Sequence, residues 1–295
     1  LLLALMAAAA PRASQEVEVG GVTYVFDIID DNSVKLRKIE VPETVTELSI
    51  PGTIEYEGQT YTVTNYSVSF SGSTNKSVTS LTLPDTLTTI GGSFRYFSNI
   101  TELTIPGSVK NFAGLMQYMK QLTKITFEEG VEEISSGSMV DSCSALTTIV
   151  LPSTLKYISG NATFSDAAAL TDINLPEGVT FSNSNGVSHF SGCTSLESIE
   201  LPASMSVIPS NMFKGCTALT TVTAKGTISK IENNAFENCK NLVTIPDLSN
   251  GTSIEDYAFR YCEKLTEVDL SSVTELGMYA FGNCTSLSGV LDLSN

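Results

Sequence analysis

The sequence lacks tryptophan altogether and contains a single histidine, and its 16 lysine and arginine residues face 32 aspartate and glutamate residues. The resulting formal charge of −16 argues against a nucleic-acid or anionic-membrane partner, because both are bound through a basic surface. Without tryptophan, a sugar-stacking platform would have to be built from tyrosine. The composition therefore favours a soluble, acidic surface or a basic partner.

The single histidine, His189, limits the enzyme classes open to the chain. A Ser-His-Asp or Cys-His hydrolase would have only this one candidate base. Ser188 and Ser191 lie beside it, but serine is abundant along the whole chain, so the adjacency carries little information. The glycine pairs at residues 20–21 and 91–92 lie at expected turns and do not form a nucleotide-binding loop. We predict a non-enzymatic protein with no catalytic residue and no cofactor.

Long apolar runs are also missing, since no stretch beyond the first ten residues approaches the ~18 apolar residues of a membrane span. Residues 1–10 read LLLALMAAAA and are followed by PRASQ. This length suits the hydrophobic region of a secretory signal. We therefore predict a signal-peptide remnant at residues 1–14, no membrane insertion, and a secreted or cell-surface location. An N-terminal helix of the fold is the alternative.

What the sequence does contain is a repeat. Residues 196–218 read LESIELPASMSVIPSNMFKGCTA, and related segments begin at Leu219, Leu242 and Leu265, at intervals of 23 residues. A fixed period of this length is typical of a solenoid, in which one short unit stacks on the next. The unit, L-T-x-I-x-L-P-x-x-L-x-x-I-x-x-x-A-F-x-x-C, begins with a strand that its proline ends. Its second half predicts short strands, turns and 3₁₀ pieces.

Earlier parts of the chain extend the solenoid less regularly and precede it with a cap. Further units begin at Val45, Val78, Ile100, Leu122, Leu146 and Leu170. Residues 16–29 predict a strand or a strand pair and residues 34–40 predict the returning strand, a hairpin that would cover the exposed edge of the first coil. We therefore divide the chain into a β cap at residues 15–44 and a solenoid at residues 45–295, with about ten units and a truncated last one.

The six cysteines share one position of the unit, three residues before the next unit begins: Cys143, Cys193, Cys216, Cys239, Cys262 and Cys284. In other units this position holds Ala167, Met119 or Phe97, so it requires apolar volume. Neighbouring Cα atoms would lie near a disulfide's distance, but their Cβ vectors run parallel. We predict buried free thiols, with occasional pairing as the alternative. No metal site is expected, because no histidine joins the column and stacked thiols do not converge tetrahedrally.

The strand positions between the buried residues form the most informative surface. Both x residues of L-T-x-I-x-L, including Pro246, are expected to face outward, and most are threonine or serine, which suits a solvated sheet or a binding face. The candidate partner-binding residues are Glu102, Lys124, Asp172, Asn174, Glu200, Thr221, Thr223, Glu267 and Asp269. Two acidic spots, Asp172 with Glu200 and Glu267 with Asp269, would meet a basic patch on a partner; neither has the spacing of a calcium loop. Candidate loop anchors are Tyr96, Tyr118 and Phe181, with a position in the core as the alternative for Phe181.

The L-P strand end, the A-F-x-x-C half and the first unit TIEYEGQTYTVT together resemble the BspA-like leucine-rich-repeat family of bacterial surface proteins. The resemblance covers residues 45–295. It implies a right-handed leucine-rich-repeat solenoid, mostly β, with a parallel sheet on one face and an N-terminal β-hairpin cap. Some units depart from the pattern at Met116, Met119, Val140 and Ala167, which keep the column apolar. Members of the family are associated with adhesion to host matrix proteins and to other cells.

These observations lead to three functional hypotheses. We expect an exported, non-enzymatic recognition or adhesion protein that binds a protein partner, such as a host matrix or cell-surface protein, through the sheet face and adjoining loops. A glycan-binding module of the cell envelope is the first alternative, and aromatic residues exposed beside the acidic spots would favour it. A structural spacer that displays a further C-terminal domain is the second.

Overall fold

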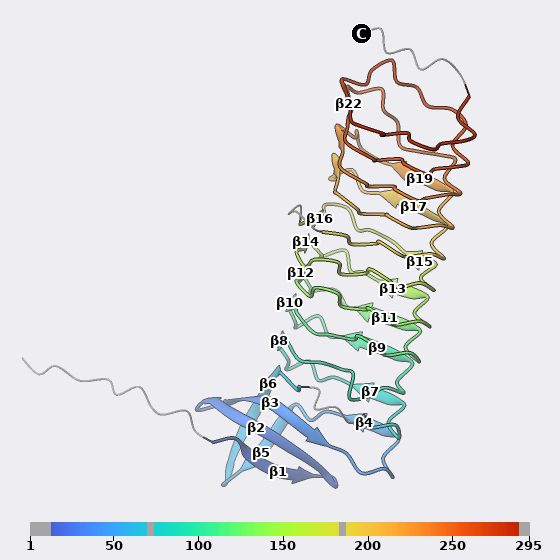
Figure 1. The fold of residues 1–295 in the computed structure, drawn as a ribbon. Helices are drawn as coiled ribbons and strands as arrows, with labels where there is room; N and C mark the ends of the chain where they lie inside the picture. The colour runs from blue at the N-terminus through green and yellow to red at the C-terminus, as the bar shows by residue number, and fades with distance from the viewer. Residues whose placement is uncertain (1–12, 70–73, 183–186, 289–295) are drawn as a thin grey trace, which may run out of the picture.

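The computed structural model describes residues 13–69, 74–182 and 187–288. The expected signal remnant at residues 1–14 lies almost entirely outside these ranges. Within them the chain forms 22 β-strands and winds into a β-solenoid with a cap at its N-terminal end (Figure 1). The described residues contain no helix long and apolar enough to cross a membrane. The predicted solenoid is confirmed.

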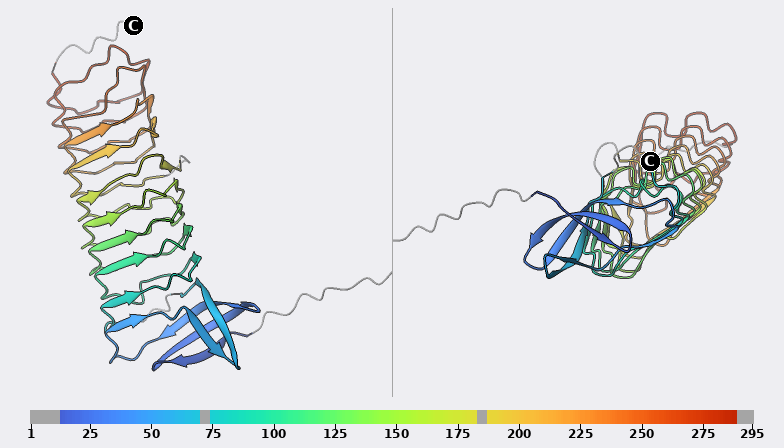
Figure 2. Two further views of the ribbon diagram at one scale, coloured as in Figure 1. Left: turned by 180° about the vertical axis from the view of Figure 1, so that it is seen from behind. Right: turned by 90° about the horizontal axis from the view of Figure 1, so that it is seen from below.

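The cap is an antiparallel sheet fused to the first coil. β1 (Gln15–Val19), β2 (Val22–Asp30) and β3 (Ser33–Glu40) pair antiparallel in chain order, which confirms the predicted N-terminal hairpin. Within the first unit, β5 (Thr53–Tyr56) and β6 (Gln59–Tyr66) form a second hairpin, and β6 lies parallel to β3. Because β6 also pairs with a strand of the solenoid, cap and coils share one sheet (Figure 2).

The expected parallel sheet runs along one side of the solenoid, with one short strand from each of successive coils; its solvent side is called the first-sheet face. Its strands are β4 (Glu47–Ser49), β7 (Ser80–Thr82), β9 (Glu102–Ile105), β11 (Lys124–Phe127), β13 (Thr148–Val150), β15 (Asp172–Ile173), β17 (Ser198–Leu201) and β19 (Thr221–Ala224). Ladders join β4 to β7, β9 to β11, β13 and β15 in turn, and β17 to β19. Side chains alternate, so that Leu103 and Ile105 are buried while Glu102 and Thr104 are exposed.

The second half of the unit contributes two-residue strands to a second parallel ladder, on the other side of the solenoid (Figure 1). Its strands after β6 are β8 (Thr89–Ile90), β10 (Asn111–Phe112), β12 (Glu133–Ile134), β14 (Tyr157–Ile158), β16 (Thr180–Phe181), β18 (Val207–Ile208), β20 (Lys230–Ile231), β21 (Ser253–Ile254) and β22 (Glu275–Leu276). In most of them the second residue points into the core, as Ile90 and Ile231 do. Strands and turns were expected here; the described residues form no 3₁₀ helix.

An aromatic column runs through the C-terminal half of the core. Phe190, Phe213, Phe236 and Phe259 are fully buried, and their rings stack with centroids between 5.1 and 5.5 Å apart and planes within 10° of parallel. Each ring comes from the same position of successive coils, so a ring is covered on both sides by its neighbours. The stability of one coil therefore depends on the next.

The cysteines form a neighbouring column in which all six thiols are free and buried, as predicted. Each thiol donates to a backbone carbonyl of the preceding coil; Cys239 Sγ, for example, lies 3.1 Å from the Phe213 carbonyl oxygen. That carbonyl also accepts the N–H of Cys216, from its own coil, at 3.1 Å. Cysteine thus supplies both apolar volume and a weak donor, whereas alanine or methionine at this position supplies volume alone.

We expect these thiols to be inert in the folded protein. Burial raises the pKa of Cys216 to about 12 and that of Cys284 to about 11, so very little thiolate forms at pH 8. With an aromatic disulfide reagent, the native protein should react on the order of 100-fold more slowly than the urea-unfolded chain. Rapid labelling of several cysteines in the native state would contradict the buried column.

Both sheets are interrupted at one level, between residues 170–182 and 196–209, which is called the seam. Among the described residues no ladder joins β15 to β17 or β16 to β18, although the closing turns stay connected, with the Phe190 N–H donating to the Met212 carbonyl at 2.9 Å. Pro209 is one cause. The residues at its position in neighbouring coils, Ser182 and Glu232, each donate a ladder N–H that proline lacks.

Candidate binding surfaces

The first-sheet face presents the predicted binding row to solvent. Lys124 and Thr221 are half-buried, and the exposed members are Glu102, Asp172, Asn174, Glu200, Thr223, Glu267 and Asp269. The strand register places Lys124 beside Glu102 and Thr223 beside Glu200. The row therefore forms one polar surface over β9 to β15 and another over β17 and β19, divided by the seam.

The first of the two predicted acidic spots is divided by the seam. Asp172 and Glu200 lie on β15 and β17, which are not paired with each other. Glu200 instead lies 3.2 Å from the Nζ atom of Lys225, which also contacts Glu177 at 2.7 Å. The Lys225 ammonium thus offsets the charge of Glu200, while Asp172 forms no ion pair with a described residue.

The second acidic spot, Glu267 with Asp269, is exposed although its segment forms no strand. Asp269 accepts a hydrogen bond from the Ser271 N–H at 2.9 Å, and hydrogen bonds from Ser271 lower the pKa of the Asp269 carboxyl. Asp269 is therefore charged at neutral pH, on a part of the surface that a basic partner can reach.

Charge reversal at this spot tests the orientation of its coil. The double variant Glu267→Lys, Asp269→Lys should melt within about 3 °C of the parent, because substitutions of exposed residues change stability little. Leu265→Lys is the matched control, since Leu265 belongs to the same segment but is fully buried; it should unfold the coil. A large fall in melting temperature for the double variant would place the two carboxylates inward.

One outward prediction is wrong, because Pro246 is buried while Thr244 of the same row is exposed. The coil that starts at Leu242 meets the first sheet only through an isolated bridge between Thr221 and Thr244. Without a strand, the two-residue alternation of side chains ends there. The chain then turns both Pro246 and Leu248 into the core.

His189 is a core residue in this structure. It is fully buried, and its Nε2 lies 3.5 Å from Ser182 Oγ and 3.3 Å from the Ser182 carbonyl oxygen. Its Nδ1 has no hydrogen-bond partner in the described part of the chain, so no carboxylate orients the ring as in a hydrolase triad. The same ranges hold no group of three or more histidine, cysteine, aspartate or glutamate side chains placed to bind a metal.

Two neighbouring cavities lie where the cap meets the first coils, and sequence reasoning missed both. The larger, about 510 Å³, is lined in part by Lys38 and Tyr96, and the smaller, about 360 Å³, in part by Arg95 and Gln117. The guanidinium carbon of Arg95 lies 4.3 Å from the centre of the Tyr118 ring, which is 43% exposed. The lining residues come from the cap and from separate coils, so no local motif marks them.

Solved structures with the same fold include leucine-rich repeat proteins from Bacteroides ovatus and Eubacterium ventriosum. The first is 21% identical, covers 90% of this chain and 80% of its own, and has a TM-score of 0.50. The second is 16% identical, covers 96% and 98%, and also has a TM-score of 0.50. A leucine rich cell surface protein from Faecalibacterium prausnitzii is 22% identical over 95% of both chains, with a TM-score of 0.44. The likeness to the first two structures shows the fold alone.

Sequence comparison goes further than the fold. No curated protein matches the chain. The family described as BspA type leucine rich repeat region, however, matches in six copies over residues 66–186 and 183–291. Because this match extends over most of the chain, the protein belongs to the BspA-type leucine-rich repeat family.

Proposed function

We propose that this protein is an exported, non-enzymatic recognition or adhesion protein that binds a protein partner through the first-sheet face and its adjoining loops. The supporting observation is the row of outward polar side chains on successive strands, from Glu102 on β9 to Thr223 on β19. Such a surface offers many modest contacts over a long distance, which suits another protein better than a small substrate.

Charge and the N-terminal sequence add to this proposal. A formal charge of −16 favours a basic partner, because opposite charges speed encounter and reject wrong partners. The apolar run at residues 1–10 supports export, and with it a secreted or cell-surface location. A host matrix protein or a protein of another cell surface is the partner class we would test first.

The test is a binding screen of the purified protein against immobilised matrix and cell-surface proteins at low and high salt. A partner that contacts the acidic residues of the first-sheet face should bind saturably, and its affinity should fall on the order of tenfold at high salt. Glu267→Lys with Asp269→Lys should weaken binding further. Glu133→Lys with Glu275→Lys makes the same charge change on the second ladder and should not. Equal losses from the two double variants would contradict the assignment to the first-sheet face.

A glycan is the second candidate ligand, and the cavities between cap and solenoid favour it. Their lining includes the polar groups of Arg95, Gln117 and Lys38, and the half-exposed Tyr118 ring lies against Arg95 beside them, a mixture that suits the apolar face and the hydroxyls of a sugar. Binding on a glycan array would support this candidate under two conditions. The double variant Gln117→Ala, Tyr118→Ala should lose the binding, and the double variant Glu267→Lys, Asp269→Lys should keep it. The absence of binding in both the protein screen and the glycan array would favour a structural spacer.

A further inference from the structure

On each wall of the seam, one backbone hydrogen-bonding group has no partner among the described residues. One coil beyond the seam, where β18 pairs with β20, the Lys230 N–H donates to the Ser206 carbonyl. Val207 is the register partner of Lys230 one coil earlier, yet its N–H donates to no described residue. The Phe181 carbonyl likewise accepts no bond from the described residues, because Pro209 has no N–H to give it. One donor and one acceptor therefore remain on opposite walls.

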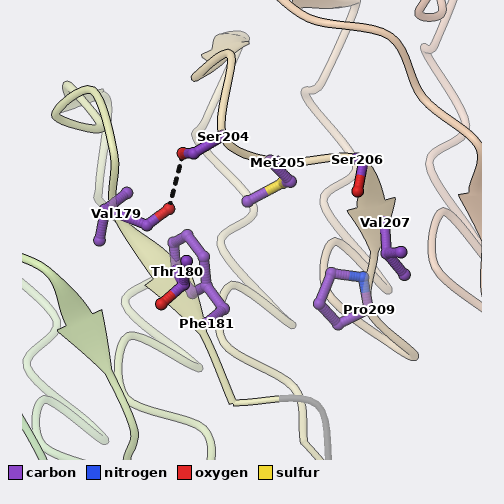
Figure 3. A pocket seen from close by; sticks show the side chains of 8 residues that line it. All are labelled: Val179, Thr180, Phe181, Ser204, Met205, Ser206, Val207 and Pro209. Carbon is purple, nitrogen blue, oxygen red and sulfur yellow. Dashed lines mark hydrogen bonds between the residues drawn. The ribbon is translucent and has the colours of Figure 1, made fainter.

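A cavity of about 140 Å³ lies between these walls (Figure 3). Its apolar lining comes from Val179 and Phe181 on one wall and from Met205, Val207 and Pro209 on the other. A dry protein cavity of ~150 Å³ accommodates a benzene ring. The seam cavity can therefore hold one branched aliphatic side chain.

Contacts around the cavity fix the positions of its walls. Ser204 Oγ donates to the Val179 carbonyl at 2.9 Å, the dashed line in Figure 3, as Thr154 Oγ1 donates to the Val131 carbonyl at 2.9 Å where β12 and β14 are paired. Phe181 is half-buried and packs on the core, with ring centroids 4.9 Å from His189 and 6.2 Å from Phe190. It therefore forms a wall of the cavity, in line with the core position that was the alternative to a loop anchor. A site formed in advance spends little free energy on ordering when a ligand binds.

We propose that the seam between β16 and β18 docks an extended segment of a protein partner, which places one branched aliphatic side chain in the cavity and pairs its backbone with Val207 and Phe181. An extended chain presents N–H and C=O groups to both of its sides in turn. It can thus give a C=O to the Val207 N–H and an N–H to the Phe181 carbonyl. The seam edges lie on the second ladder, so this site stands or falls independently of the first-sheet face.

The probe for this site is N-acetyl-leucine N-methylamide, which has one branched side chain and an amide on each side of it. The chain has seven methionines, and Met205 lines the cavity, so carbon-13 methyl labels on methionine report binding there. We expect the Met205 signal to move saturably with millimolar affinity, while the signals of Met116 and Met139 in other coils stay fixed. N-acetyl-glycine N-methylamide lacks the side chain and 3-methylbutan-1-ol lacks the amides; each should bind at least tenfold more weakly.

Matched variants complete the test. Val207→Phe fills the cavity and should abolish the Met205 response. Lys230→Phe places the same ring at the equivalent position one coil further on, where the ladder is closed, and should leave the response intact. Thr180→Phe fills the cavity from the opposite wall and replaces Val207→Phe should that variant fail to fold.

Two results would overturn the proposal. One is a Met205 signal that does not move in the parent protein, or that moves equally in the filled variants. The other is equal affinity for the alcohol, which would show a cavity for small apolar molecules without backbone pairing.

Discussion

Replacing Phe236 by alanine should lower the free energy of unfolding by ~3–5 kcal/mol. The Phe236 ring is fully buried, with its centroid 5.4 Å from that of Phe213 and 5.1 Å from that of Phe259. Truncation removes both ring contacts and leaves a void, which the neighbouring coils cannot fill without disturbing their own ladders. Urea unfolding followed by circular dichroism measures the loss.

Tyr157→Ala is the control for this experiment. Tyr157 is also an aromatic residue of a coil, but it lies on β14 with 54% of its surface exposed, so its truncation should change stability by no more than ~0.5 kcal/mol. A near-neutral Phe236→Ala would remove the aromatic column from the core. It would also remove the argument that neighbouring coils support each other through that column.

The repeat made the solenoid predictable, because buried positions that recur at a fixed spacing must stack into columns. Phe236 and Cys239 could be placed in the core from spacing alone. The bond between Cys239 and the Phe213 carbonyl could not, since it depends on where the carbonyl of the preceding coil points. Short strands were expected in the second half of the unit, but their pairing into a second ladder was not, because strands of two residues, such as Lys230–Ile231, are too short to show an alternating pattern.

The exposure of the binding row could be predicted from the two-residue period of a strand. The prediction was wrong at Pro246, where the chain forms no strand. The seam arises from departures from the repeat. Phe181 takes the position that Ile158 holds in the preceding coil, and Pro209 takes the place of a ladder donor. The consensus sequence of the repeat does not contain such departures. The seam and its cavity therefore could not be predicted from the consensus.

The pH dependence of stability should show the second large effect, and it arises at His189. Burial lowers the pKa of this imidazole from 6.5 to about 4, because its cation would lie in an apolar core beside Phe181 and Phe190. The unfolded chain binds a proton near pH 6.5, whereas the folded chain does not until about pH 4. The folded protein therefore loses stability as the pH falls through this window. The loss attributable to His189 is about 3 kcal/mol at pH 4 and nearly absent above pH 7.

His189→Met separates this effect from that of the carboxylates, because both proteins share every other titrating group. Methionine already fills the equivalent position of the next coil, as Met212. At pH 7.5 the variant should equal the parent or exceed its stability by about 1 kcal/mol, since it removes a buried Nδ1 that no described residue pairs. At pH 4 its advantage in urea unfolding should be about 3 kcal/mol larger. A parallel decline of both proteins from pH 7 to pH 4 would mean that His189 takes up its proton in the folded state. The Phe181 wall of the seam, which packs on this ring, would then have to open to water.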